Sequence, residues 1–334
     1  MLRLHMNESP YPPSRISIEY VNRYAGSLNL YYDKALYDEL MGELSKYVGV
    51  DEGLIEVFPG SSAVLTLMLT YARVAGLDLV ATHPTFHVMY GLARSYGVGS
   101  QYLSLRGESF TLDVEELLRR CEGRLVYIIN PNNPTGNLLL QDPDVVREVA
   151  RRAKAVFVDE AYYEFSGVTF KDLAAELDNV AIIRSVSKSF CLAGARFGYA
   201  VLGRGVKRVL NSLRIGFEVP LTTQAAVLGA LKDLQYVREV VRSIVETRER
   251  TRRGLEEMGL RTVESQTNFI LVDLGRPCRD LWGELKGRGV LTLCLQNVED
   301  LREFSNYVRV SVGRPEEMEF FLQTMASALE GLEK

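Results

Sequence analysis

Histidine and cysteine are scarce in this sequence, and both shortages limit the chemistry that the chain can perform. Three histidines and four cysteines occur among 334 residues. His83 and His87 have the spacing of a helical zinc pair, but Pro84 follows His83 directly and the glutamate of an H-E-x-x-H motif is absent. The cysteines form no C-x-x-C pair, so we expect free and mostly buried thiols, as in a reducing cytoplasm, rather than a zinc site or disulfides. The four are Cys121, Cys191, Cys278 and Cys294.

Other absences exclude whole classes of protein. The formal net charge is −4, so the basic excess of a general nucleic-acid binder is missing. No apolar secretory core follows the N-terminus and no run approaches the ~18 apolar residues of a membrane span, which predicts a soluble, cytoplasmic protein. No G-x-S-x-G elbow accompanies the few histidines, which argues against a Ser-His-Asp hydrolase. A dehydrogenase or NTPase is disfavoured, because Gly203 and Gly205 lack the third glycine of G-x-G-x-x-G and no G-x-x-x-x-G-K-[ST] occurs.

Short apolar runs rich in β-branched residues alternate with helical stretches through the first two thirds of the chain. Continuous runs of this kind are typical of strands that are buried on both faces. The pattern therefore predicts an α/β fold with a mostly parallel central sheet. The predicted strands are residues 77–82, 124–129, 154–158, 180–184 and 197–202.

Changes in composition and hydrophobic pattern divide the chain into three segments. Residues 1–25 are rich in Pro, Ser and Asn and are expected to form an extended arm that packs with a small domain. Residues 26–245 are expected to form the large domain and residues 246–334 a smaller α+β domain, with a long charged helix over 222–258 near the boundary. The remaining predicted elements are helices over 33–48, 63–76, 279–287 and 315–331 and strands over 268–274 and 307–313.

Three of the predicted strands are each followed by a polar cluster. Residues 130–136 read N-P-N-N-P-T-G, residues 159–162 read D-E-A-Y, and residues 185–188 read S-V-S-K. Ligands of open α/β sheets bind beyond the carboxyl ends of the strands. The three clusters, which are far apart in the sequence, are therefore expected to meet in one crevice.

The clusters contain the side chains that pyridoxal-5′-phosphate (PLP) chemistry requires. Lys188 can carry the cofactor as a Schiff base and move a proton, and Asp159 can keep the pyridine nitrogen protonated. Asn133 and Tyr162 can reach the phenolic oxygen, and Phe86 can stack on the ring. Each residue alone has an ordinary structural explanation, and it is their joint order at successive strand ends that favours PLP. The candidate ligands of the phosphate are Ser61, Ser62, Ser185, Ser187 and Arg196.

Together these motifs make the chain resemble the fold-type I PLP-dependent aminotransferases, and among them the histidinol-phosphate aminotransferase group. The resemblance covers nearly the whole chain, and S-V-S-K followed by A-G-x-R is its most specific part. It implies a homodimer that passes an amino group from an amino acid or a phosphate-bearing amine to a 2-oxo acid, commonly 2-oxoglutarate. The matching segments are residues 6–14, 59–63, 83–90, 130–136, 159–165, 185–200, 265–272 and 308–313.

The resemblance also implies roles for residues outside the strand ends. Tyr32 is expected to reach the cofactor phosphate of the neighbouring subunit, with the adjacent Tyr31 as the alternative. Arg309 is expected to bind the acidic group of the substrate. The other residues expected around the substrate are Asn7, Glu8, Tyr11 and Asn133.

One segment departs from the family pattern. Histidinol-phosphate enzymes usually carry a further arginine in a segment like G-I-x-V-R, whereas residues 289–295 read G-V-L-T-L-C-L. Arg288 and Arg302 are candidates to replace it. The missing arginine weakens the case for a phosphate-bearing substrate, because the guanidinium fork matches phosphate geometry. An aromatic amino-acid aminotransferase and a lyase like threonine-phosphate decarboxylase therefore stay open as alternatives.

Overall fold

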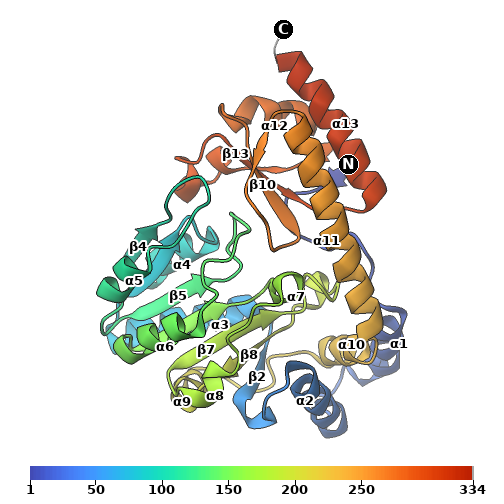
Figure 1. The fold of residues 1–334 in the computed structure, drawn as a ribbon. Helices are drawn as coiled ribbons and strands as arrows, with labels where there is room; N and C mark the ends of the chain where they lie inside the picture. Colours follow the sequence, from blue (N-terminus) through green and yellow to red (C-terminus); the bar gives the residue numbers. More distant parts are fainter. Residues whose placement is uncertain (333–334) are drawn as a thin grey trace.

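The computed structural model describes residues 1–332, which form a large lower part and a smaller upper part (Figure 1). The strands of the large part are β2 (Ile55–Phe58), β3 (Leu79–His83), β4 (Ser100–Ser104), β5 (Leu125–Ile129), β6 (Ala155–Asp159), β7 (Val180–Ser185) and β8 (Gly198–Leu202). They form one sheet in the order β2-β8-β7-β6-β5-β3-β4. Strands β3 to β7 are parallel, and only β8 runs against its neighbours. The predicted α/β fold with a mostly parallel sheet is confirmed.

All five strands predicted for this sheet are present, with ends shifted by at most two residues. The two edge strands, β2 and β4, were not predicted. Strand β4 has the sequence S-Q-Y-L-S, in which only Leu103 is buried. A half-exposed edge strand with polar residues lacks the continuous apolar run by which a central strand is identified.

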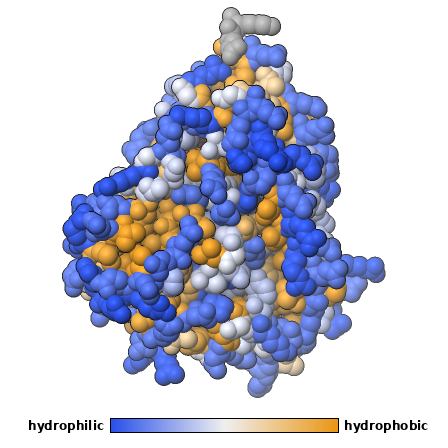
Figure 2. Space-filling view, in the orientation of Figure 1, coloured by the Kyte–Doolittle hydropathy of each residue, from blue (hydrophilic) through white to orange (hydrophobic). Residues whose placement is uncertain are grey.

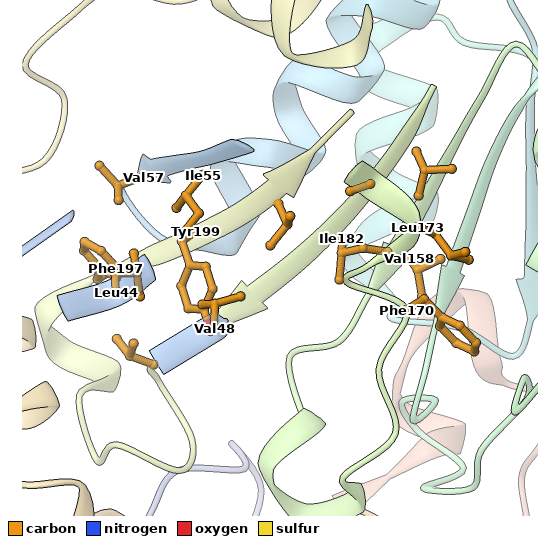
Figure 3. Close-up of a cluster of buried hydrophobic side chains, with 14 of the residues drawn as sticks. Leu44, Val48, Ile55, Val57, Val158, Phe170, Leu173, Ile182, Phe197 and Tyr199 are labelled. Atoms are coloured by element: carbon orange, nitrogen blue, oxygen red, sulfur yellow. The ribbon is translucent and has the colours of Figure 1, made fainter. Parts of the chain in front are cut away.

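Helices cover both faces of the sheet, and the alternation of side chains along each strand separates two hydrophobic cores. In β6, Val156 and Val158 belong to one core, whereas Ala155 and Phe157 belong to the other. Part of the first core is shown in Figure 3, where Leu44 and Val48 lie beside Tyr199. The helices of this part are α2 (Lys34–Val48), α3 (Ser61–Ala75), α4 (Val88–Tyr96), α5 (Val114–Arg120), α6 (Pro143–Arg152), α7 (Tyr163–Ser166), α8 (Leu173–Glu176) and α9 (Arg204–Ser212).

The upper part contains a four-stranded antiparallel sheet in the order β12-β13-β10-β9. These strands are β9 (Arg261–Thr262), β10 (Phe269–Asp273), β12 (Leu293–Cys294) and β13 (Tyr307–Ser311). Helices α12 (Cys278–Gly287) and α13 (Pro315–Leu332) pack with it. The N-terminal strand β1 (Leu2–Arg3) pairs with β11 (Val290–Leu291), so the first residues of the chain lie against this sheet-and-helix unit. The boundaries of the arm and of the two domains stay predictions.

Two helical predictions need correction. The expectation of an extended segment over residues 1–25 is wrong for its second half, which is helix α1 (Arg15–Tyr24), capped by the side chain of Ser14. This helix packs tightly on α10 (Leu221–Leu231): the Ser17 hydroxyl donates to the carbonyl of Ala226, and a Cβ at Gly229 would lie 2.7 Å from the Cα of Ser17. The single long helix over 222–258 is two helices, α10 and α11 (Leu234–Glu257).

The surface shown in Figure 2 is hydrophilic over most of the upper part and around the periphery. Apolar residues gather on the left, where β4, α5 and β5 lie in Figure 1. Within residues 1–332, no helix has both the length and the apolar character needed to cross a lipid bilayer.

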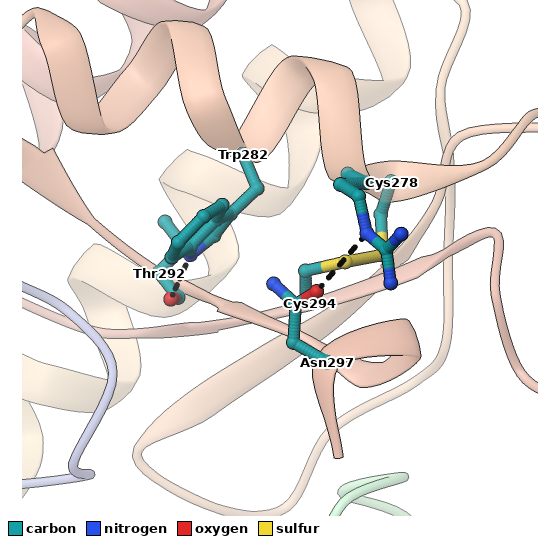
Figure 4. Close-up of a disulfide and its surroundings, with 6 residues drawn as sticks. Cys278, Trp282, Thr292, Cys294 and Asn297 are labelled. Atoms are coloured by element: carbon teal, nitrogen blue, oxygen red, sulfur yellow. Dashed lines mark hydrogen bonds between the residues drawn. A yellow bond between two sulfur atoms is a disulfide. The ribbon is translucent and has the colours of Figure 1, made fainter. Parts of the chain in front are cut away.

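The prediction of four free thiols is wrong for two cysteines. Cys278 and Cys294 form a disulfide between the start of α12 and strand β12, with 5.7 Å between their Cα atoms (Figure 4). Cys121 and Cys191 are free. The two bonded residues are 16 positions apart in the sequence, and only the packing of α12 on β12 brings them together. The indole of Trp282 in α12 donates to the carbonyl of Thr292, the residue directly before β12.

Removal of this disulfide is expected to lower the free energy of unfolding. Closing a loop of this length contributes about 3 kcal/mol, so Cys278→Ser and Cys294→Ser should each reduce the melting temperature. Thiol titration of the denatured, unreduced protein should detect two thiols, and titration after reduction should detect four. Detection of four thiols before reduction would contradict the bond.

Candidate active site

The carboxyl ends of β5, β6 and β7 open into a cavity of about 540 Å³. This cavity also receives residues from the N-terminal arm and from the upper sheet, so it contains segments from nearly the whole chain. Glu8 lines it as well. Of the predicted site residues, those that line it are Asn7, Ser61, Ser62, Phe86, Asn133, Asp159, Tyr162, Ser185, Ser187, Lys188, Arg196 and Arg309.

Lys188 follows β7 and faces the cavity. Its amine lies 3.4 Å from the carbonyl oxygen of Met6, to which it donates. Burial lowers the pKa of Lys188 to about 8, and the charges of Arg309 and Arg196 act in the same direction, against Glu8. A neutral amine is the form that attacks a carbonyl carbon, so the environment of Lys188 favours a nucleophile.

Asp159 is the last residue of β6 and is almost fully buried. One of its carboxylate oxygens accepts a hydrogen bond from the hydroxyl of Tyr127 at 2.9 Å, and the other accepts from the amide of Ala161 at 3.0 Å. Burial raises the pKa of Asp159 to about 6, although both hydrogen bonds oppose this shift. Both donors are neutral, so a cationic group placed against the carboxylate would stabilise its ionised form.

Arg309, in the middle of β13, is 5% exposed. Its guanidinium donates to the side-chain oxygen of Asn133 at 2.6 Å and to the carbonyl oxygen of His5 at 2.7 Å. Its Nε has no hydrogen-bond partner among the described residues. Burial lowers the pKa of Arg309 to about 10, opposed by Tyr162. A buried guanidinium whose recorded partners are neutral is a strong site for an anion.

The hydroxyl of Tyr162 is held from two sides. The amides of Asn7 and Asn133 both donate to it, at 3.1 and 3.4 Å. Asn7 has a left-handed backbone, with φ of 52°, and is fixed by hydrogen bonds with Ser311 and Asn268. The arm and the segments that follow β5 and β6 thus meet at the hydroxyl of Tyr162, and Ser311 of β13 holds the arm residue Asn7 in place.

Another group of residues that line the cavity is suited to hold an anion. Ser61 and Ser62 begin helix α3, whose N-terminal amides point toward the cavity end. Gly198 of β8 makes this approach possible, because a Cβ there would lie 2.2 Å from the amide nitrogen of Ser61. The guanidinium of Arg196 lies against Gly60, at 2.7 Å from where a Cβ of that glycine would be. A helix N-terminus with an adjacent arginine is a typical phosphate site.

Several predicted residues lie elsewhere. Tyr32 packs against Phe217 in a separate surface cavity, and Tyr31 is 87% exposed. The hydroxyl of Tyr11 is hydrogen-bonded to Ser243 of α11, outside the cavity. Of the two arginines considered as replacements, Arg288 is bound to Ser327 of α13 and neither it nor Arg302 lines the cavity.

Other residues at the site were not singled out from the sequence. Tyr127 holds Asp159, and His5, His87 and Leu293 line the cavity. No motif points to Tyr127, which is one apolar residue among several in its strand. The other three positions had a usable signal, because His5 lies two residues before the predicted Asn7, His87 follows the predicted Phe86, and Leu293 lies in the segment 289–295 that departs from the family pattern.

A buried ion pair lies directly behind the site. The guanidinium of Arg184 donates to the carboxylate of Glu160 at 2.7 Å and to the hydroxyl of Thr169 at 2.7 Å. The same guanidinium lies 3.5 Å from the ring centre of Tyr163. Glu160 adjoins Asp159 and Arg184 adjoins Ser185, so the pair connects the ends of β6 and β7. Burial acts to lower the pKa of Arg184, but the charge of Glu160 outweighs it and raises the pKa.

Comparison with known proteins matches residues 1–325 to the family described as aminotransferase class I and II. A histidinol-phosphate aminotransferase of Sulfurisphaera tokodaii is 32% identical, covering 98% of this chain and 90% of that protein. Histidinol-phosphate aminotransferase 1 of Archaeoglobus fulgidus is also 32% identical, covering 98% and 99%. The crystal structure of histidinol-phosphate aminotransferase from Sinorhizobium meliloti, in complex with pyridoxal-5′-phosphate, superposes with a TM-score of 0.86 at 25% identity, covering 99% of this chain and 91% of that one.

Proposed function

The chain belongs to the class I and II aminotransferase family, and we propose that it is a PLP-dependent aminotransferase whose amino donor is histidinol phosphate. The acceptor is a 2-oxo acid, for which 2-oxoglutarate is our choice. The observation that carries the proposal is the buried guanidinium of Arg309, whose two hydrogen-bond partners are neutral, in the same cavity as Lys188 and Asp159. The names of the relatives favour an aminotransferase over the lyase alternative.

The residues of the cavity fit PLP. When bound, PLP supplies an aldehyde that condenses with amines and a ring that accepts electron density. Lys188 offers an amine with a lowered pKa for covalent attachment, and Asp159 offers a carboxylate for the ring nitrogen. Asn133 and Tyr162 offer donors for the phenolic oxygen. The phosphate would be held by Arg196 and by the four residues Ser61, Ser62, Ser185 and Ser187.

The side chains of this chain then have separate tasks. Arg309 binds the anionic group of the donor and orients its amine toward Lys188. The Nζ of Lys188 takes the proton from the donor carbon that bears the amine and later returns a proton. Phe86 and the arm residue Asn7 exclude water from the reacting atoms.

We further propose a homodimer formed through the face around Tyr32. Large apolar side chains are exposed there, and they would be buried by a second copy. In this arrangement Tyr32 reaches the cofactor phosphate of the other subunit. A cytoplasmic location is part of the same proposal, in which the fully buried disulfide of Cys278 and Cys294 is shielded from cytoplasmic reductants. The exposed residues of this face are Leu28, Leu30, Tyr31, Tyr32, Ile215 and Phe217.

Replacement of Arg309 tests the donor site. In Arg309→Met, kcat/KM for histidinol phosphate with 2-oxoglutarate should fall by about 100-fold or more, since loss of one partner of a buried charged interaction costs about 2–5 kcal/mol. Most of the loss should appear in KM, while the visible absorbance of the bound cofactor persists. Arg288→Met, which removes an arginine of the same part of the chain outside the cavity, is the matched control. A change of less than three-fold in Arg309→Met would exclude Arg309 as the anion site.

A further inference from the structure

Tyr127 reaches Asp159 from the core side of the large sheet. Strands β5 and β6 are parallel neighbours, in which Ile129 lies beside Asp159 and Tyr127 lies beside Phe157. Residues two apart in a strand project on the same face, so all four side chains share the face that carries the second core. Tyr127 therefore extends diagonally along this face, and its hydroxyl donates to Oδ2 of Asp159 at 2.9 Å. Asp159 lines the cavity and Tyr127 does not, so the tyrosine holds the carboxylate from behind.

The hydroxyl of Tyr127 is dedicated to this one contact. Within residues 1–332, Asp159 is its only hydrogen-bond partner, and the tyrosine side chain is 0% exposed. Burial, together with the charge of Asp159, raises the pKa of Tyr127 well above its usual range. The phenol therefore stays a neutral donor wherever the protein is folded. A hydroxyl without a partner is costly in an apolar core, so the geometry of Tyr127 is matched to the carboxylate.

Asp159 depends on Tyr127 for half of its support. The other hydrogen bond to its carboxylate comes from the amide of Ala161, which donates to Oδ1 at 3.0 Å. Burial raises the pKa of Asp159, and of the two hydrogen bonds that oppose this shift the one from Tyr127 is the stronger. One donor to each oxygen fixes the plane of the carboxylate and supports its ionised form. A phenylalanine at position 127 would fill the same space in the core and leave Asp159 with one donor.

We propose that Tyr127 is a positioning residue of the aminotransferase reaction, which directs the carboxylate of Asp159 toward the ring nitrogen of PLP. This inference rests on the proposed function, in which Asp159 keeps that nitrogen protonated. Tyr127 lies outside the cavity and touches neither the substrate nor the reacting atoms, so it acts only through Asp159. Its removal should therefore weaken the hold on the cofactor and slow the reaction, and it should leave the binding of the amino donor at Arg309 unchanged.

Tyr127→Phe removes the hydroxyl and keeps the ring. The dissociation constant of PLP, measured by equilibrium dialysis, should rise by about 10-fold or more, because a hydrogen bond to a charged group contributes about that factor. For histidinol phosphate with 2-oxoglutarate, kcat should fall while KM stays within about two-fold. Tyr199→Phe is the matched control, since Tyr199 is equally buried in β8 but belongs to the core on the other face of the sheet, and it should change neither quantity. Unchanged PLP affinity and kcat in Tyr127→Phe would overturn the inference.

A cycle of variants with Asp159→Asn tests whether Tyr127 acts through Asp159. In the Asp159→Asn background no carboxylate is left to direct, so Tyr127→Phe should change the dissociation constant of PLP by less than about two-fold. The same large loss in both backgrounds would mean that Tyr127 acts through packing, and it would exclude the positioning role. Equal PLP affinity of the native protein and Asp159→Asn would overturn the role of Asp159 and the inference together. Failure of the native protein to bind PLP would instead remove the proposed function itself.

Discussion

Lys188→Ala is expected to abolish aminotransferase turnover while the protein stays folded. Loss of a positioned proton-transfer group costs a factor of about 10²–10⁴ in rate, and Lys188 also serves as the point of covalent attachment in the proposed function. Its amine is the only lysine amine that lines the cavity among the described residues, so no neighbour can replace it. Turnover of histidinol phosphate and the visible absorbance of the bound cofactor are the two measurements. Both should be lost, because PLP without covalent attachment absorbs differently.

The control for this substitution is Lys46→Ala, which removes an exposed lysine that pairs with Glu43 on the surface. It should keep full activity.

A second measurement follows from the pKa of Lys188, which burial lowers to about 8. The rate of PLP attachment to cofactor-free protein should rise about ten-fold per pH unit below pH 8 and level off above it, since the neutral amine attacks. Sustained turnover in Lys188→Ala, or a rate that rises up to pH 10, would contradict the assignment.

The site residues that could be predicted from the sequence are those whose positions depend on the local pattern of apolar and polar residues. Val156 and Val158 alternate with Ala155 and Phe157 in a run with no polar residue, so strand β6 and its burial on both faces could be predicted. Asp159 comes directly after this run, and the topology of parallel strands places all such residues at one edge. The prediction of the crevice therefore needed no knowledge of distant contacts.

Other features depend on contacts between residues that are far apart in the sequence. Arg309 donates to the carbonyl of His5 across 304 positions, and no local pattern indicates that pairing. The disulfide of Cys278 and Cys294 depends in the same way on the packing of α12 against β12. Helix α1 was missed because the prolines before Ser14 dominate the composition of the arm, while its contact with Gly229 of α10 is tertiary. Such features depend on tertiary packing, and the composition and periodicity of the sequence carry no information about tertiary contacts.

The ion pair behind the active site is the clearest case of a tertiary feature with a large energetic effect. Arg184 and Glu160 are 1% and 0% exposed, so each charge depends on the other. Removal of one partner leaves an uncompensated buried charge, which costs about 3–5 kcal/mol. Arg184→Met should therefore lower the free energy of unfolding by that amount. The measurement is the urea midpoint, with the slope of the transition checked for constancy.

A double variant separates the charge effect from the loss of packing. In Arg184→Met combined with Glu160→Gln, both charges of the pair are removed, and an amide oxygen at position 160 can still accept from the amide of Phe170. The double variant should therefore be more stable than Arg184→Met alone. The exposed pair of Arg152 and Glu148 is the control, because its removal should hardly change the urea midpoint. If Arg184→Met were as stable as that control, the pair would not hold the ends of β6 and β7, and the positions of Asp159 and Lys188 would need another explanation.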